Sequence, residues 1–290
     1  AFSAIQSKNT PVSKETVWNP KRASDDIVLP MPCDLFMALK TVAVPGGVSS
    51  DRRFTMGVNQ TSEKREIYER SFQSHIAASF TAADLPNSWI PKLGVTREDG
   101  FSYYFLGKYE VSKGQWDAVM QGVESDGSDG VCPKIDQGAA LPVRNVSWFD
   151  VQEFVKRYNA WLIQHAQARL PKYAGTNNIG FLRLPTEEEW EYAARGGTSV
   201  REEDRENNDT FVPGNERAED YGVFLGNDTP IREQPLNIGS RKANPLGIFD
   251  TMGNVSEMID GFFHVTIEEL GSDNVQHSRL HGASGGLLCK

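Results

Sequence analysis

The sequence predicts an α+β fold in which regular elements are few and long, organised loops carry much of the chain. Two observations lead to this class. First, apolar segments with strand patterns and short amphipathic helices are interspersed between residues 35 and 197. Second, residues 198–290 are rich in Gly, Asn, Asp and Pro and show no helix pattern. A loop of roughly 90 residues exceeds ordinary connections, so bound ions or dense side-chain-to-backbone hydrogen bonding should hold it.

Three apolar segments have the composition of β-strands. Residues 35–47 contain β-branched residues and end in a Pro-Gly-Gly turn, and residues 52–57 are the expected hairpin partner. Residues 103–112 form the third strand. The mixed-charge segment 61–80 has apolar residues only partly in phase with a helical repeat, and we interpret it as a helix.

Capping signals mark three shorter helices. Ser112 with Gln115, and Ser147 with Asp150, have capping-box spacing, in which each side chain bonds the backbone amide of the other residue. Thr186 is the expected cap of a third helix, which ends at a Gly-Gly pair. The second helix presents an apolar stripe of Val151, Phe154, Val155, Tyr158 and Leu162.

Charged residues near the third helix divide into two groups. Glu187, Glu188 and Glu189 are expected to be solvated and to complement the positive end of the helix dipole, rather than to act as paired acid and base groups. Arg183 lies inside an apolar strand and is expected to pair with a buried carboxylate.

Composition excludes several partners. The formal net charge is −9 and no block of Lys and Arg is present, which argues against nucleic acid and anionic membranes. The polar first twenty or so residues are typical of a mature terminus after signal-peptide removal. Two glycosylation sequons, at Asn145 and Asn254, fall in segments expected to be core, so we favour a bacterial envelope over a glycoprotein.

The three cysteines, Cys33, Cys132 and Cys289, are far apart and form no CxxC pair, so a structural zinc site is not expected. One disulfide with one free thiol is allowed, and Cys33–Cys132 is the favoured pair, because Cys289 lies next to the end of the sequence. The pair would also tether the long loop 124–138.

Four phrases resemble one family. They are FLGKYEVSKGQWDAVM (105–120), LPVRNVSWFDVQEFVKRYNAWL (141–162), FLRLPTEEEWEYAARGG (181–197) and NIGSRKANPLGIFDTMGNVSEM (237–258). Their order and spacing are similar to those of the formylglycine-generating-enzyme, or sulfatase-modifying factor, family. The resemblance implies a C-type-lectin-like fold stabilised by calcium, with a domain over residues 35–290 behind an extended arm, residues 1–34.

The family divides into enzymes and non-catalytic members. The enzymes oxidise a sulfatase cysteine to formylglycine with paired cysteines, copper and oxygen. Here HGASGG (281–286) replaces the family's Gly-Gly-Ser turn, and Cys289 lies five residues after Ser284 instead of three. The second cysteine, the Arg-rich run and the closing strand do not follow Cys289 in this sequence, and a missing C-terminal strand is one interpretation of that difference. Cys289 is the one candidate catalytic thiol; we favour a small buried side chain, no catalysis and no copper.

The phrase GIFDTMGNVSEM carries the candidate metal site. Carboxylates and backbone carbonyls on tight turns are the oxygen ligands that Ca²⁺ prefers. By resemblance, Asp250, Gly253, Val255 and Glu257 match the family's calcium ligands. The phrase departs from the family at Ser256 and Met258, where tryptophans are usual. An acid-decorated turn without an ion is the alternative.

The sequence leaves three functional hypotheses open. The lead-in DDIVLPMPCDLFMALKTVAVP (25–45) is similar to the start of a periplasmic family member that promotes activation of a membrane-spanning Ser/Thr kinase in type VI secretion. This implies a periplasmic, non-catalytic accessory protein that binds a protein partner, such as the periplasmic part of that kinase. The alternatives are a copper- and oxygen-dependent cysteine oxidase and a lectin-like ligand receptor.

Overall fold

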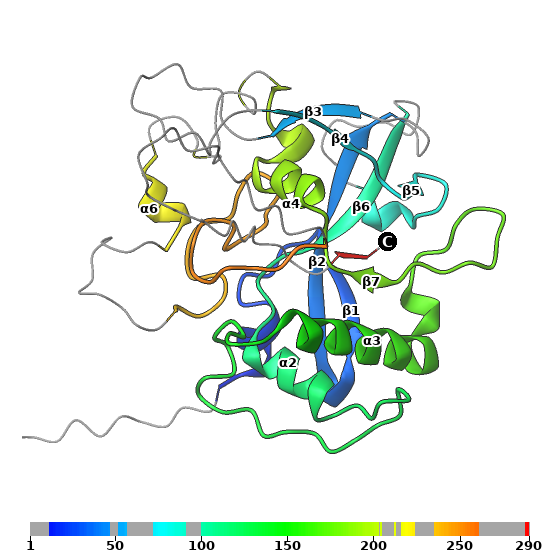
Figure 1. The fold of residues 1–290 in the computed structure, drawn as a ribbon, viewed down its shortest axis with the longest axis vertical. Coiled ribbons are helices and arrows are strands. Elements are labelled where there is room, and N and C mark those ends of the chain that lie inside the picture. Colours follow the sequence, from blue (N-terminus) through cyan, green and yellow to red (C-terminus); the bar gives the residue numbers. More distant parts are fainter. Residues whose placement is uncertain are drawn as a thin grey trace, which may run out of the picture.

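The computed structural model describes residues 12–46, 52–56, 72–90, 100–202, 204, 212, 216–223, 235–260 and 288–289. Its centre is an antiparallel sheet with the order β1-β2-β6-β8-β7, and β5 also pairs with β6 (Figure 1). The strands are β1 (Ile27–Met31), β2 (Leu35–Pro45), β5 (Phe80–Thr81), β6 (Phe101–Gly107), β7 (Leu182–Arg183) and β8 (Leu288–Cys289). A second sheet pairs β3 (Arg52–Met56) with β4 (Phe72–Ile76).

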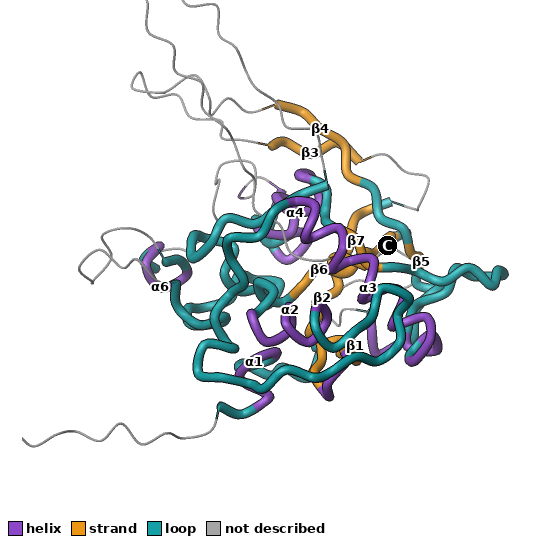
Figure 2. Tube along the Cα trace, turned by 60° about the horizontal axis from the view of Figure 1, so that its bottom comes forward, coloured by secondary structure: helices purple, strands orange, loops and turns teal. Residues whose placement is uncertain are grey.

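Helices flank this sheet at two levels. α2 (Lys113–Met120) and α3 (Trp148–His165) lie beside the lower half of β1 and β2, and α4 (Glu187–Ala194) lies near β3 and β4 (Figure 1). The shorter helices are α1 (Lys14–Trp18), α6 (Ala218–Tyr221) and the 3-10 turns Pro32–Asp34, Asn87–Trp89, Gln167–Arg169 and Gly197–Ser199. Loops make up most of the described trace beyond α4 (Figure 2). The predicted α+β class with sparse regular structure is confirmed.

The capping predictions are confirmed in detail. Ser112 with Gln115, Ser147 with Asp150, and Thr186 with Glu189 each form a reciprocal capping box. All five residues of the predicted α3 stripe are buried. α6 is a short helix within the segment that shows no helix pattern in the sequence; four residues are too few to produce a periodic signal.

One strand-pairing prediction and one helix prediction are wrong. β3 pairs with β4 and not with β2, whose residues 35–39 pair with β1 and whose residues 39–45 pair with β6. The predicted helix over 61–80 is a strand in its described part, where Phe72–Ile76 forms β4. Pairing with β3 buries Ile76, and this tertiary gain overrides a weak helical pattern. Residues 61–71 lie outside the described residues.

The described part of the expected arm, residues 12–34, packs onto the sheet. Val17 and Trp18 of α1 are buried, and β1 is an edge strand. A buried charge network fixes this segment: the Asp26 carboxylate lies 2.7 Å from Lys108 Nζ and 2.9 Å from Lys40 Nζ. These hydrogen bonds lower the pKa of Asp26 although burial opposes them. A buried acid between two lysines holds the segment to β2 and to the chain just after β6.

Helix α3 protects both edges of the sheet. The Tyr158 hydroxyl donates to the carbonyl of Pro30 in β1, at 2.9 Å. The neighbouring Asn159 donates to the carbonyl of Leu182 in β7, at 2.7 Å, and accepts from the Leu182 amide, at 2.8 Å. Two adjacent residues thus satisfy backbone groups of both edge strands, which blocks further strand pairing there.

Two other expectations need correction. Asn145 is exposed, at a positive φ of 59°, so its sequon does not lie in the core as expected. Glu189 is buried and ion-paired with Arg183 at 2.6 Å, so it is not a solvated dipole complement. The same pair confirms the buried carboxylate expected for Arg183. No helix in the described part of the chain is long and apolar enough to cross a membrane.

Candidate functional site

Cys289 lies in the middle of the central sheet. β8 is inserted between β6 and β7, and its Cys289 backbone is paired with Phe105 on one side and Leu182 on the other. Residues 288 and 289 are the two described residues of this strand. HGASGG (281–286) lies outside the described residues.

The other two cysteines form the predicted disulfide. Cys33 and Cys132 are bonded, with their Cα atoms 5.4 Å apart. The sequence contains three cysteines, so Cys289 is the single thiol left within these 290 residues. A site built from two thiols of this chain would require the disulfide to open.

The loop that carries the candidate metal ligands is wound tightly. Asp250, Gly253 and Asn254 all have positive φ values, of 60°, 78° and 65°. Val223 anchors the loop: its amide donates to the carbonyl of Met252, and its carbonyl accepts from the amide of Asn254. Asp250 is buried, and its Oδ2 accepts from the amide of Gly239 at 2.7 Å.

A third carboxylate, Glu110, joins this loop. Its Oε2 accepts from Asn254 Nδ2 at 2.6 Å and its Oε1 accepts from the amide of Val255 at 3.1 Å. Glu257, on the same loop, accepts from Trp190 Nε1 at 3.1 Å. Sequence reasoning missed Glu110, although a glutamate within the largely apolar run YYFLGKYEV indicated a buried carboxylate with a specific partner.

Of these three carboxyl groups, Glu110 and Asp250 are buried and Glu257 is half-buried. Burial raises the pKa of Glu110, and the charges of Glu257 and Asp250 raise it further. Burial also raises the pKa of Asp250 and of Glu257, the latter with a contribution from the Asp250 charge. A cluster of carboxylates that resists ionisation is one that a cation would stabilise.

The residues fit a hard cation with a mixed ligand set. Within the described part of the chain, no three His, Cys, Asp or Glu side chains are placed to hold a metal by themselves. The backbone carbonyls of Gly253 and Val255 accept no hydrogen bond from the described residues, and they lie on the turn that carries Asp250 and Glu257. Two carboxylates and two free carbonyls are the oxygen donors that Ca²⁺ prefers.

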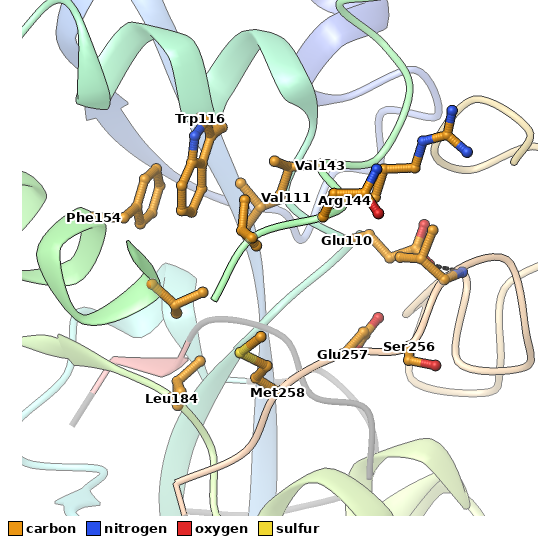
Figure 3. A pocket seen from close by; sticks show the side chains of 14 residues that line it. Glu110, Val111, Trp116, Val143, Arg144, Phe154, Leu184, Ser256, Glu257 and Met258 are labelled. Atoms are coloured by element: carbon orange, nitrogen blue, oxygen red, sulfur yellow. Dashed lines mark hydrogen bonds between the residues drawn. The ribbon is translucent and has the colours of Figure 1, made fainter. Parts of the chain in front are cut away.

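An apolar pocket adjoins this loop. Its volume is about 270 Å³. One wall comes from α2 and α3, where the Trp116 and Phe154 rings stack with centroids 5.0 Å apart. Leu184 and Met258 face them across the cavity, with Glu110 and Glu257 toward one end (Figure 3). The apolar lining is completed by Val111, Val143, Val146, Val151 and Val255, and the remaining lining residues are Arg144, Asn145 and Ser256.

The surroundings of the pocket are aromatic and acidic. Trp148 and Phe149, at the start of α3, are 45% and 78% exposed and pack edge to face, between the lining residues Val146 and Val151 in sequence. Asp150 is exposed on the same turn. Asp260 is also exposed, and its amide donates to the carbonyl of Pro185, next to the lining residue Leu184. The sequence did not predict this pocket.

The family follows from a direct comparison. Residues 37–286 match the model of the sulfatase-modifying factor enzyme 1-like domain. This match covers most of the chain, so the protein belongs to that family, as the four phrases in the sequence indicate.

The individual proteins described next are at most 30% identical to this chain. The chain is similar to the chaperone protein LppX of Paenibacillus barcinonensis, with 30% identity over 186 residues; the match covers 54% of this chain and 61% of that protein's length. Among solved structures it is similar to Treponema denticola variable protein 1, with 19% identity over 91% of this chain and 98% of that one, and a TM-score of 0.48. PvdO from Pseudomonas aeruginosa gives 20% identity over 82% of this chain and 75% of its own, and a TM-score of 0.44.

Proposed function

We propose that this chain is a non-catalytic member of its family that binds another protein. The observation that supports this most is the count of thiols. Family oxidases use two cysteines, whereas the disulfide leaves this chain with Cys289 alone. A single thiol in the middle of a sheet is a small core side chain in the ordinary case. The pocket and the exposed aromatic pair beside it offer a surface for a partner.

The calcium ion belongs to the same proposal. Asp250 and Glu257 would supply carboxylate oxygens and Gly253 and Val255 carbonyl oxygens. The ion would neutralise charge that burial otherwise opposes, and would fix the loop that forms one side of the pocket. Its role would be structural, since no water-activating group is needed for binding a protein.

The finer assignment rests on the lead-in to the domain. Residues 25–45 resemble the start of TagR, a periplasmic accessory protein of type VI secretion. On that basis the chain is periplasmic, and its partner is the periplasmic part of the Ser/Thr kinase PpkA, whose activation it promotes. The net charge of −9 favours a basic docking surface on the partner.

A binding assay tests the partner directly. Biolayer interferometry with the immobilised periplasmic part of the kinase should give saturable, calcium-dependent binding, and Cys289→Ala should bind as the parent does. In parallel, a sulfatase-motif peptide incubated with the protein, copper and oxygen should remain unmodified by mass spectrometry. Formylglycine formation that is lost in Cys289→Ala would refute the non-catalytic assignment and establish the oxidase alternative.

A lectin-like ligand receptor is the remaining alternative. In that case, biolayer interferometry with this protein immobilised should detect binding of glycans from a panel and no binding of the kinase part. The name of the similar chaperone protein LppX suggests a further variant of protein binding, in which the partner is an unfolded chain. Binding of reduced, unfolded lactalbumin but not of the folded kinase domain would favour that variant.

A further inference from the structure

The pocket between α2, α3 and residues 255–258 offers room for one large side chain. Its volume of about 270 Å³ lies at the lower limit of ordinary small-molecule sites. The walls are formed by the stacked Trp116 and Phe154 rings and by aliphatic side chains, with Met258 opposite them. Aromatic and thioether groups accommodate a flat ring well. The space therefore suits a single aromatic anchor better than an extended ligand.

The exposed residues around the pocket are those that dominate protein interfaces. Trp148 and Phe149 form an edge-to-face pair in which both residues are exposed, Phe149 the more so. Arg144 lines the pocket and its guanidinium extends away from the apolar side chains (Figure 3). Tryptophan and arginine are the residue types most enriched among energetically important interface positions. An anchor in the pocket would place its flanking residues against this pair.

Charge identifies the chemistry of the occupant. The exposed Asp150 directly precedes the lining residue Val151, the exposed Asp260 follows the lining residue Met258 by two positions, and the whole sequence carries a net charge of −9. Arg144 is the one cation among its lining residues. Complementarity then requires positive charge next to the anchor. An acidic peptide or an anionic lipid headgroup would meet repulsion at the same place.

We propose that this pocket receives an aromatic side chain of a partner protein, presented on a segment with Lys or Arg beside it. This rests on the proposed function, because it names the part of the partner that docks. Ser256 makes the proposal testable: it is exposed and lines the pocket, so Ser256→Trp introduces a bulky aromatic side chain at the lining without removing a buried group.

The probe is the capped pentapeptide Lys-Gly-Trp-Gly-Lys, titrated into protein labelled with ¹³C at its methionine methyl groups. The Met258 signal, assigned through Met258→Leu, should shift in a saturable manner. Replacing the peptide tryptophan by alanine should weaken binding by about tenfold or more, because a buried ring contributes at least that much. The counterpart Glu-Gly-Trp-Gly-Glu should bind more weakly than the lysine peptide.

Two variants locate the site. Ser256→Trp should abolish the peptide shift, and a ring-current shift of Met258 in the free variant would show that its indole occupies the pocket. Met258→Trp serves as a second filler, read out by anisotropy of a labelled peptide. Asn177→Trp, on an exposed loop away from the pocket, should bind as the parent does. Equal binding by the parent and by a variant whose indole fills the pocket would overturn the proposal.

The kinase domain separates this proposal from the proposed function. If the kinase domain binds the parent and Ser256→Trp equally, the pocket proposal fails and the accessory function stands. If the peptide binds in the pocket but the kinase domain does not, the pocket proposal stands and the partner is wrong. A Met258 shift with phosphatidylglycerol vesicles and none with any peptide would instead identify an acyl chain and overturn the proposal.

Discussion

Opening the Cys33–Cys132 disulfide should lower stability without changing the folded shape. The bond joins positions separated by 99 residues, and closing a loop of about that length in the unfolded chain is worth about 4.7 kcal/mol in the chain-entropy treatment. The loop that carries Cys132 keeps other anchors when the bond opens: Trp161 Nε1 donates to Asp129 at 2.9 Å, and Arg157 donates to the carbonyl of Val123 at 2.9 Å. The effect therefore lies mainly in the unfolded state.

The magnitude converts into a measurable shift. For a chain of 290 residues, about 4.7 kcal/mol corresponds to a fall in Tm of about 8 °C. The assay compares thermal and urea unfolding with and without dithiothreitol, for the parent and for Cys33→Ala/Cys132→Ala. The double variant should melt like the reduced parent and should not respond to dithiothreitol, and Cys289→Ala should respond as the parent does. An oxidised and a reduced parent with the same midpoint would refute the reasoning.

Four further predictions follow from the buried charges and the sheet edges. Calcium chelation should lower Tm, because an ion that binds only the folded state stabilises it by mass action. A Tm that chelation leaves unchanged would refute the proposal of a bound calcium ion. With calcium chelated, the free energy of unfolding should fall as the pH rises from 5 to 8. The reason is that the raised pKa values of Glu110, Asp250 and Glu257 make the folded state hold protons more tightly than the unfolded state does. Added calcium should reduce this pH dependence. Arg183→Ala should destabilise by about 3–5 kcal/mol in urea unfolding, since it leaves Glu189 charged and buried. Asn159→Ala should lower the free energy of unfolding by about 1–3 kcal/mol and increase self-association measured by light scattering, because the amide and the carbonyl of Leu182 in β7 both lose the Asn159 side chain as hydrogen-bond partner. The control Asn177→Ala should change neither quantity.

Local signals in the sequence predicted local structure well. Each capping box needs only residues three apart, so Ser112, Ser147 and Thr186 could be read as helix starts from the sequence alone. The buried partner of Arg183 was predictable in kind, because a guanidinium in an apolar strand requires a carboxylate nearby. Its identity as Glu189 was not, because the same residue has the pattern of an exposed helix start.

Long-range pairing could not be predicted in the same way. The segment 52–57 has the pattern of a hairpin partner for β2, and only the strand pairing shows that β2 pairs with β1 and β6 while β3 pairs with β4. The packing of α1 and β1 likewise depends on Asp26, whose two lysines come from positions 14 and 82 residues further along the chain. Charge pairs at such separations leave no local pattern.

The candidate site shows the same division between local and distant residues. The phrase around residues 250–257 predicts an oxygen-rich turn, and the positive φ values of Asp250 and Gly253 are what such a turn requires. Glu110 belongs to the site through hydrogen bonds to Asn254 and Val255, 144 and 145 residues away. Whether a cation binds depends on all three carboxylates, so the sequence could indicate the ligands without indicating how strongly their charges oppose one another.

The ion site and the pocket share one piece of backbone. Glu110 fixes Val255 through its amide, and Trp190 holds Glu257, so residues 255–257 are positioned from both ends. Val255, Ser256 and Glu257 also line the pocket. A cation that orders this turn therefore orders one wall of the pocket as well, and a partner that fills the pocket stabilises the turn that holds the cation. For the cation and the partner proposed above, binding of the two would be reciprocal by thermodynamic linkage, so the ion would contribute to recognition without touching the partner.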